Sequence, residues 1–550
     1  MFSSTADDDN DHIFTVKEDE LLGRSIYSVS SHTAGTILAS EPIYLAALGS
    51  DDIRANIICN ESYCHSCYHK LRTESIYCCT VCNQSYYCSY QCQSIHYQSI
   101  HWIICILITR MNPITVGLPY KYYPPQIMLL LQLCITKILV YSDMNTTNTT
   151  LQQLQQYNKL HYIEPSSTRE AQKGNFNTVM YARRILIPLL PAIHASKWNR
   201  PDDGLTLDNR SKLCLVDMVY VENIVNDTEA MLVDSLRISA NNYAMRHIGI
   251  CLSLYFSLLN HQCETPNVRV EYVNNTAQLR AIKDIESGDE LTTSYISMPA
   301  TYESRQLQLK NKFDFICSCQ QCVSYNTVPG KLIDYRLHKY KCSNKFAPVT
   351  QCNGYLIESS NDNTDTVQCF ICRREQSLIP LQKLHQHVTN TLLDANDIVH
   401  DGDINIGINV LYKSLYMLLD SHAVDDQHEL IFQLLNQLSE LLTIQQSTDT
   451  QLLLRVLVAI TPNIPVYTSE LCMHYMNVAD KAMDCEQYGI ALKYNLLAVE
   501  LDKKLRCMSP QQYNESTNMI TALKLMSSDK LKVSDNLNAT DLATLFSDIK

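Results

Sequence analysis

The alternation of apolar and polar positions divides the chain into β-type and helical segments. Residues 21–46 contain short apolar runs separated by Gly and Pro, which predicts a small all-β unit. Residues 268–282 contain two strand-like runs around an Asn-Asn turn, which predicts a β-hairpin. Residues 111–236 and 381–550 have helical periodicity, and polar loops are expected at 143–150 and 165–168. The pattern therefore predicts an α+β protein.

Two helical stretches have a more specific pattern. Ile127–Tyr141 is the most apolar, but it is interrupted by Gln132 and Lys137 and is too short to cross a bilayer, so a helix with one apolar face is expected. Near the C-terminus, small and aromatic residues have the spacing of one tetratricopeptide-like helix pair. These residues are Ala479, Ala482, Tyr488, Ala491, Tyr494 and Ala498.

Composition narrows the classes of function. The 550 residues are 46% apolar and 18% charged, as in globular proteins, and the net charge of −13 is unfavourable for non-specific nucleic-acid binding. The N-terminus MFSSTADDDNDH lacks the order of a secretory signal. We therefore expect a cytosolic or nuclear protein without membrane or nucleic-acid partners. In such a reducing compartment, the 23 cysteines indicate metal ligands and free thiols rather than disulfides.

Residues 64–105 contain eight thiol or imidazole groups in four close pairs, which is what two tetrahedral zinc sites require. His96 is a minor rival to His101 as a ligand, and Cys78 could exchange with Cys79. The pairs are Cys64-x2-Cys67, Cys79-x2-Cys82, Cys88-x3-Cys92 and His101-x3-Cys105.

A third zinc site is expected further along the chain. The apolar run 252–259 predicts a buried segment, and the polar pair Asn260-His261 ends it. Cys263 follows this pair. A later cluster, Cys317-x-Cys319-x2-Cys322, leaves a tetrahedral zinc one ligand short, and Cys263 is the natural fourth.

A last set of cysteines leaves two interpretations open. Cys369-x2-Cys372 is a good half-site, and Cys352-Asn-Gly resembles a zinc-ribbon knuckle, whereas the nine residues between Cys342 and Cys352 are too many for a standard knuckle. The set is either a fourth structural zinc site or two free thiols beside a partial site.

The order of these motifs resembles a known family. Asn260-His261-x-Cys263 before Pro-Asn, then Gly-Asp-Glu-Leu at 288–291 leading to Tyr295, and Phe315 before the cysteine cluster, resemble the core and post-SET segment of a SET-domain lysine methyltransferase. With the zinc module, the arrangement resembles the SET-and-MYND (SMYD) family. This resemblance implies an N-terminal SET part (1–60), a MYND zinc finger (61–106), a helical insertion (107–237), a catalytic SET core (238–300), a post-SET zinc segment (301–325), a possible zinc ribbon (326–380) and a C-terminal TPR-like helical domain (381–550).

The resemblance also implies ligand sets and site residues. The MYND pairs would interleave, so that Cys64, Cys67, Cys88 and Cys92 hold one zinc while Cys79, Cys82, His101 and Cys105 hold the other. The implied activity is methylation of protein lysine with S-adenosylmethionine as donor, with Tyr295 as catalytic residue and Tyr243 and Phe313 walling the lysine channel. The residues implied to contact the donor are Gly23, Arg24, Asn241, Ser257, Leu259, Asn260, His261, Tyr295 and Phe315.

Several positions depart from the family pattern. Ser25 stands where a second glycine is usual, Ser297 where Asp is usual, and one extra residue lies within 263–266. The interval from Cys92 to His101 is also one residue longer than expected. An alternative is therefore a catalytically degenerate adaptor that binds protein partners through its zinc finger and helical tail.

Overall fold

A computed structural model of the chain describes residues 14–19, 23–49, 62–71, 76–110, 124–142, 148–160, 169–197, 207–245, 249–263, 265–273, 275–296, 301–343, 345–346, 350–358, 366–400, 403–444, 450–461, 469–505, 508 and 510–526. The chain divides into two compact units. The first comprises Met1–Thr33, Ile37–Ile296 and Gln306–Cys317, and the second comprises Ala34–Thr36, Ser297–Arg305 and Ser318–Lys550.

The first unit contains several small β-sheets. The β-rich character predicted for 21–46 and the hairpin predicted within 268–282 are both confirmed, since the strands of that hairpin pair in antiparallel register from Val268–Ala281 to Val273–Thr276. The strands are β1 (Phe14–Asp19), β2 (Gly23–Ser28), β3 (Ile37–Pro42), β4 (Leu45–Leu48), β5 (Tyr77–Cys78), β6 (Tyr86–Tyr87), β7 (Asn242–Ala244), β8 (Gly249–Leu252), β9 (Asn260–His261), β10 (Val268–Val273), β11 (Thr276–Ala281) and β12 (Thr292–Thr293).

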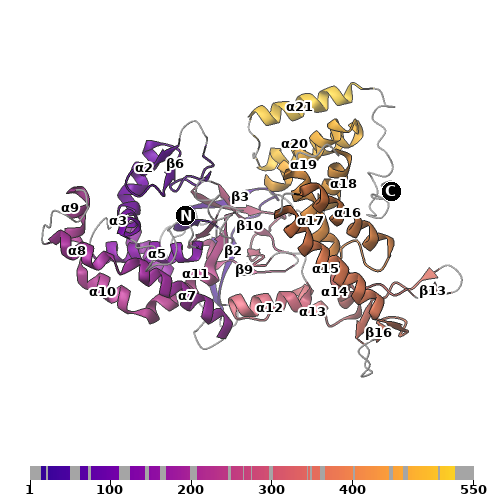
Figure 1. Ribbon diagram of the computed structural model, residues 1–550, viewed down its shortest axis with the longest axis horizontal. Helices are drawn as coiled ribbons and strands as arrows, with labels where there is room; N and C mark the ends of the chain where they lie inside the picture. Colours follow the sequence, from indigo (N-terminus) through magenta and orange to yellow (C-terminus); the bar gives the residue numbers. More distant parts are fainter. Residues whose placement is uncertain are drawn as a thin grey trace. The chain divides into compact units, whose positions relative to one another are not determined.

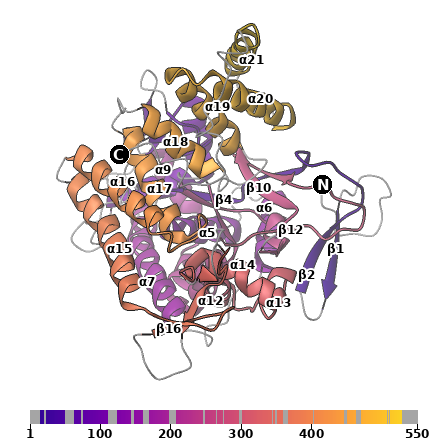
Figure 2. The same cartoon turned by 90° about the vertical axis from the view of Figure 1, so that its right-hand side faces the viewer.

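The pairing of these strands joins distant parts of the sequence. β3 adds to the β10–β11 hairpin, and β4 pairs with β8 in the order β4-β8-β7. β1 and β2 run antiparallel as a ribbon, drawn in indigo in Figure 2. β9 and β12 run parallel, with Thr292 opposite Asn260 and Thr293 opposite His261. This parallel pair positions the candidate site.

Helices form the other part of the first unit, drawn in purple and magenta in Figure 1. Helix α6 begins at Asn148, so the polar loop predicted for 143–150 ends earlier than expected; 143–147 and the loop predicted at 165–168 lie outside the described residues. The helices are α2 (Tyr90–His96), η1 (Tyr97–His101, a π-helical segment), α3 (Trp102–Arg110), α5 (Pro125–Tyr141), α6 (Asn148–Asn158), α7 (Arg169–Leu186), α8 (Leu189–Lys197), α9 (Leu207–Leu215), α10 (Met218–Asn226) and α11 (Thr228–Asn241).

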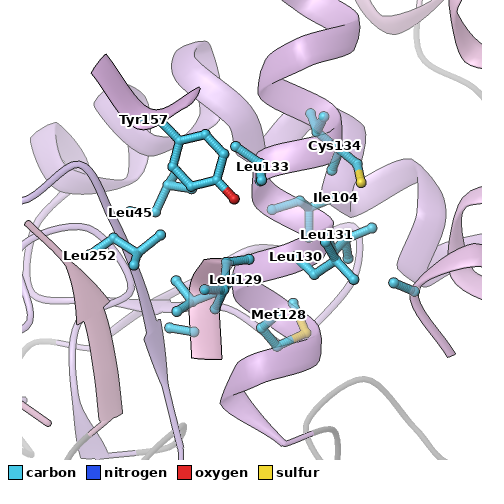
Figure 3. Packing of buried hydrophobic residues seen from close by; sticks show 14 of the residues in the cluster. Leu45, Ile104, Met128, Leu129, Leu130, Leu131, Leu133, Cys134, Tyr157 and Leu252 are labelled. Atoms are coloured by element: carbon cyan, nitrogen blue, oxygen red, sulfur yellow. The ribbon is translucent and has the colours of Figure 1, made fainter. Parts of the chain in front are cut away.

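Helix α5 lies at the centre of this core. The consecutive residues Leu129, Leu130 and Leu131 are fully buried, so the helix is apolar on nearly every side and the expected single apolar face was wrong. Figure 3 shows α5 residues beside Leu45 of β4 and Leu252 of β8. The charge of Lys137 is neutralised by Asp234 of α11. Among the described residues, no helix has both the length and the apolar content needed to span a membrane.

The second unit contains small sheets and a series of helices in which each of α15 to α20 packs against the next. The buried Ala479, Ala482, Ala491 and Ala498 confirm the helix pair predicted near the C-terminus, formed by α19 and α20. The elements are β13 (Lys345–Phe346), β14 (Thr350–Gln351), β15 (Leu356–Glu358), β16 (Thr366–Cys369), β17 (Glu375–Ser377), α13 (Gln320–Ser324), α14 (Val328–His338), α15 (Ile379–His400), α16 (Ile404–Asp420), α17 (Glu429–Ile444), α18 (Thr450–Ile460), α19 (Ser469–Asp484), α20 (Tyr488–Leu505) and α21 (Pro510–Lys524). The division between the units falls within α12 (Tyr302–Phe313).

Candidate active site and cysteine clusters

The parallel pair β9–β12 places the Asn-His motif beside the segment that leads to Tyr295. The Asn260 side-chain amide donates to Ser25 Oγ at 2.7 Å and to Glu290 Oε1 at 2.8 Å. Ser25 lies in β2 and is 1% exposed. Three separate segments therefore meet at one carboxamide, whose orientation is set by two acceptors.

His261 connects this site to a thiol. Its Nδ1 accepts a hydrogen bond from the Tyr295 backbone N–H at 3.0 Å, and its Nε2 lies 3.1 Å from Cys263 Sγ. An imidazole whose Nδ1 accepts carries its proton on Nε2 when it is neutral. The Nε2–H group therefore donates to the Cys263 sulfur.

Aromatic rings gather around Tyr295. The centroid of its ring lies 4.7 Å from that of Phe313 and 6.3 Å from that of Phe315, which is nearly perpendicular to it. The Tyr295 hydroxyl donates to the Leu259 carbonyl. Burial, with a smaller effect of the Glu290 carboxylate, raises the pKa of the Tyr295 phenol, so this group is neutral near pH 7. The structure thus brings Leu259, Asn260, His261, Tyr295, Phe313 and Phe315 together.

Tyr243, the other residue predicted to wall the lysine channel, is held by Phe256. Its hydroxyl donates to the Phe256 carbonyl at 2.6 Å. Burial raises the pKa of this phenol well above its ordinary value, and the electrostatic effect of Tyr295 acts in the same direction. Tyr243 is therefore a neutral ring that is held in place and is close enough to Tyr295 for an electrostatic effect.

The remaining residues predicted to contact the donor have other partners in the structure. The Arg24 guanidinium donates to the Lys159 carbonyl, and the Asn241 side chain donates to the Arg237 carbonyl at 2.8 Å within its own helix. The Ser257 hydroxyl lies 3.4 Å from the Asn241 carbonyl, so these two positions do meet. Gly23 pairs with Asp19 in the β1–β2 ribbon.

Glu41 is a residue of this region that the sequence reasoning did not identify. Its carboxylate, 6% exposed, accepts from the Ser253 hydroxyl and from the backbone N–H groups of Tyr255 at 3.3 Å and Phe256 at 3.1 Å. It thereby caps the 3₁₀ turn η3 (Phe256–Leu258) that leads into the Asn-His motif. Burial raises the pKa of this carboxyl group. The only signal in the sequence was an acidic residue next to Pro42, in a strand that begins with the apolar run Ile37–Ala39.

The cysteines and His101 of residues 64–105 form two groups with the interleaved pairing that the family resemblance implied. Cys64, Cys67, Cys88 and Cys92 form one, and Cys79, Cys82, His101 and Cys105 form the other; in each, all ligand atoms lie within 4.8 Å of one another. The separations Cys67–Cys88, Cys88–Cys92 and Cys79–Cys105 are 3.5, 3.6 and 3.7 Å between sulfurs. Zinc–sulfur bonds of about 2.3 Å in a tetrahedron imply sulfur–sulfur edges of about 3.8 Å, so the geometry fits zinc.

The π-helical segment η1 explains the long interval between Cys92 and His101. Ser89 caps α2, accepting from the Cys92 N–H at 3.1 Å, and fixes Cys92 in the first turn. One extra residue in a helix is accommodated as a π turn, and Tyr97–His101 forms one, so His101 still lies with Nε2 3.7 Å from Cys82 Sγ. His96 instead lies with Nδ1 3.1 Å from the Tyr87 hydroxyl, and Cys78 is not in either group.

The third predicted thiol group is also assembled. The Cys263 and Cys317 sulfurs are 3.8 Å apart. Together with the sulfurs of Cys319 and Cys322, they all lie within 4.8 Å of one another. Gln306 holds Cys317 from both sides, donating to its carbonyl at 3.0 Å and accepting from its N–H at 2.8 Å. The fourth set, Cys342, Cys352, Cys369 and Cys372, forms a group of the same size.

Comparison with known proteins now gives the family. Residues 44–296 match the family model of the SET domain. The chain is 22% identical over 371 residues to "Histone-lysine N-methyltransferase ASHR1" of Arabidopsis thaliana, covering 65% of this chain and 64% of that protein. It is 25% identical over 316 residues to "N-lysine methyltransferase SMYD2-B" of Xenopus laevis, covering 56% and 60%, respectively. Over 81 residues, 15% of this chain and 19% of its relative, it is 41% identical to "Histone-lysine N-methyltransferase SMYD3" of Homo sapiens.

The SET-domain match and these relatives support an SMYD-type SET protein. It spans about three-fifths of the length of ASHR1 and SMYD2-B. The split β fold, the thiol groups and the helical C-terminal region agree with the fold expected of an SMYD-type protein.

Of the departures from the SMYD pattern that bear on the candidate active site, the structure describes Ser25. Ser25 lies in regular β pairing opposite Lys17 and is not among the described residues with positive φ, so it does not force its backbone into a glycine-only conformation. Its hydroxyl instead contacts Asn260. Ser297 lies outside the described residues, and so does Glu264 of the interval 263–266 that contains the extra residue.

Proposed function

We propose that this protein is an S-adenosylmethionine-dependent protein-lysine N-methyltransferase. The observation that carries the proposal is the gathering of Asn260, His261, Tyr295, Phe313 and Phe315 around the β9–β12 pair. The names of its relatives, all lysine methyltransferases, support the same reaction.

The groups present fit the chemistry of the methyl donor. A carboxamide (Asn260) and a carboxylate (Glu290) lie side by side, and they suit the ammonium and carboxylate of an amino acid. Phe315 offers a ring face to a purine. Bound S-adenosylmethionine would supply an electrophilic methyl group.

The chain's own residues would prepare the lysine. A free lysine has a pKa of about 10.4, and an apolar channel lowers it because desolvation disfavours the ammonium. Tyr243, Tyr295 and Phe313 present neutral rings at this point. Because the Tyr295 hydroxyl donates to the Leu259 carbonyl, its oxygen remains available to accept an N–H from the amine and to align it.

Zinc would have a structural role in the three thiol groups of the finger and post-SET segment. Each group supplies four protein ligands, which leaves no position for a catalytic water. We also propose a cytosolic or nuclear location, where cysteines stay reduced and can bind zinc. The finger at 61–106 would then be of the MYND type and bind protein partners.

A degenerate adaptor is the second candidate. The observation that favours it is the hydrogen bond from Asn260 to the buried Ser25, because this bond occupies the amide that a donor would use. In that case the finger and the helical tail would bind proteins without methyl transfer.

Calorimetric titration of the full chain with S-adenosylhomocysteine separates the two candidates. The enzyme is expected to bind with a dissociation constant on the order of micromolar, about 8 kcal/mol. Incubation with labelled donor and a panel of lysine peptides should then label the peptides. Failure to bind either the donor or its demethylated product would leave the adaptor.

A further inference from the structure

The fourth thiol group has the geometry of a complete metal site. Cys342, Cys352, Cys369 and Cys372 place their sulfurs within 4.8 Å of one another, and the first three are buried. The sulfurs of Cys342 and Cys372 are 3.7 Å apart, as are those of Cys352 and Cys369. These values match the edge of about 3.8 Å expected for a zinc tetrathiolate.

The long interval between Cys342 and Cys352 does not prevent this assembly. β13 and β14 pair in antiparallel register, with Lys345 opposite Gln351 and Phe346 opposite Thr350. This hairpin returns the chain to the cluster. A short insertion between the two ligands therefore replaces the tight turn of a standard knuckle.

Backbone contacts hold the four cysteines in place. The Cys342 N–H donates to the Gly354 carbonyl at 2.8 Å, and Cys369 lies opposite Leu356 in the β15–β16 pair. Cys369 and Cys372 flank a turn closed by the bond from the Arg373 N–H to the Cys369 carbonyl at 3.0 Å. The small sheet thus presents its thiols from two sides.

Hydrogen-bond donors lie close to two of the four sulfurs. The Cys372 N–H lies 3.4 Å from Cys369 Sγ, and Gln376 Nε2 lies 3.0 Å from Cys342 Sγ. Such donors stabilise thiolates rather than thiols. A Cβ on Gly354 would lie 2.5 Å from Cys369 Sγ and 3.3 Å from Cys352 Sγ, so this position has no room for a side chain.

We propose that Cys342, Cys352, Cys369 and Cys372 bind a structural Zn²⁺ that stabilises residues 340–377 as a zinc ribbon. Among the described residues, the buried apolar side chains of this cluster, apart from the cysteines, are only Leu356 and Val367, too few for a stable core. A tetrathiolate zinc supplies the missing folding free energy. This site is additional to the three zincs of the proposed function and does not depend on methyl transfer.

The ribbon also shapes its neighbourhood within the second unit. The Lys341 N–H donates to the Ala423 carbonyl at 2.7 Å, and the Tyr355 hydroxyl donates to Asp425 at 3.0 Å. Lys341, Tyr355 and Asp425 line a hollow of about 700 Å³, together with Arg336 and His422. The metal would therefore fix one wall of this hollow.

Metal content of the full chain tests the proposal. Wild-type protein purified without added metal is expected to hold four zincs, and the double variant Cys369→Ser/Cys372→Ser three, measured by mass spectrometry of the elements. Cys472→Ser is the control, because this buried thiol donates to the Ala498 carbonyl outside the clusters and a serine can do the same. The difference in zinc content between wild type and double variant decides the proposal, whatever the occupancy of the other three sites. Equal zinc in the two proteins would overturn it.

Thiol alkylation supplies a second readout that keeps all four cysteines in place. The four cysteines should resist iodoacetamide in the native protein and react after chelation, whereas the buried Cys472 should remain protected in both states. Gly354→Ala should make the four thiols reactive without removing a ligand. Peptide mapping that finds Cys342 linked to Cys372, or Cys352 to Cys369, by a disulfide in freshly purified protein would overturn the zinc assignment. Four thiols that react before chelation would overturn it as well.

Discussion

The hydroxyl of Ser25 accepts a hydrogen bond from the side chain of Asn260, 235 residues later in the chain, at 2.7 Å. Ser25 stands where the family usually has a glycine, and Asn260 is the residue expected to hold the methyl donor. The same amide also donates to Glu290. Ser25, which departs from the family pattern, is therefore hydrogen-bonded to Asn260, the residue expected to bind the donor.

Ser25→Gly is expected to raise affinity for S-adenosylhomocysteine several-fold, because the hydroxyl competes with the donor for the Asn260 amide. The variant should lose about 1–2 kcal/mol of stability, from the lost hydrogen bond and the entropy of glycine in a strand. Calorimetry and urea denaturation measure the two effects.

Ser25→Ala is the matched control for this prediction. It removes the hydroxyl but keeps Cβ, so improved binding in both variants indicates competition for the amide, and improvement in the glycine variant alone indicates steric obstruction. Weaker binding in both would show that Ser25 positions Asn260 for the donor and that our expectation was wrong.

Tyr295→Phe is expected to lower the rate of methyl transfer by roughly 10²-fold or more, the effect of losing one positioned polar group in a dry site. Donor affinity should change little, because the Asn260 and His261 contacts remain. Tyr44→Phe is the control: its hydroxyl is buried without a hydrogen-bond partner and its ring lies beside that of Tyr157, so its removal should leave the rate unchanged. Equal rates in Tyr295→Phe and wild type would show that the active site lies elsewhere.

The local patterns of the sequence predicted groups of residues better than their individual bonds. Paired cysteines at short spacing must approach one another in any fold, so the two finger groups could be predicted. Glu41 could not, because its role depends on Ser253 and Phe256, which lie more than 200 residues away in the sequence. The π segment that absorbs the extra residue before His101 also follows from three-dimensional constraints, since nothing in the sequence 97–101 marks it.

His101→Ala is expected to reduce zinc by one atom per chain, whereas His96→Ala should keep the full zinc content. The reason is that His101 Nε2 points at the Cys82 sulfur, while His96 contacts the Tyr87 hydroxyl. Loss of the contact between His96 and Tyr87 should lower the free energy of unfolding by about 1 kcal/mol. Elemental analysis with thermal denaturation checks both, and metal loss in the His96 variant alone would reverse the assignment.

Glu41 predicts a pH dependence of stability. Burial raises its folded-state pKa above the ordinary value of 4.5, so the stability it contributes is fully present below about this pH and is lost as pH rises through the raised value. Glu41→Gln removes this titration. As the pH rises from about 4.5 through the raised pKa, the unfolding free energy of wild type should therefore fall relative to that of Glu41→Gln. Comparing the two at each pH cancels acid-induced metal loss, and a difference independent of pH would contradict the prediction.

The two nitrogens of His261 are predicted to have separable roles. Nδ1 accepts from the Tyr295 N–H, and Nε2–H donates to the Cys263 sulfur. An asparagine places its amide near the position of Nδ1, and a glutamine places its amide near that of Nε2.

His261→Asn should therefore keep the Tyr295 segment in place, with its amide oxygen accepting from the backbone N–H, but leave the Cys263 thiolate without a donor and weaken zinc retention against a chelator. His261→Gln should retain zinc but release the Tyr295 N–H, so that methyl transfer falls more than donor binding. Rates at saturating donor and peptide, together with the rate of zinc release to a chromogenic chelator, measure both effects. If the two variants lose activity and zinc in the same proportion, His261 acts only as packing between β9 and Tyr295, and the division of roles between its nitrogens is wrong.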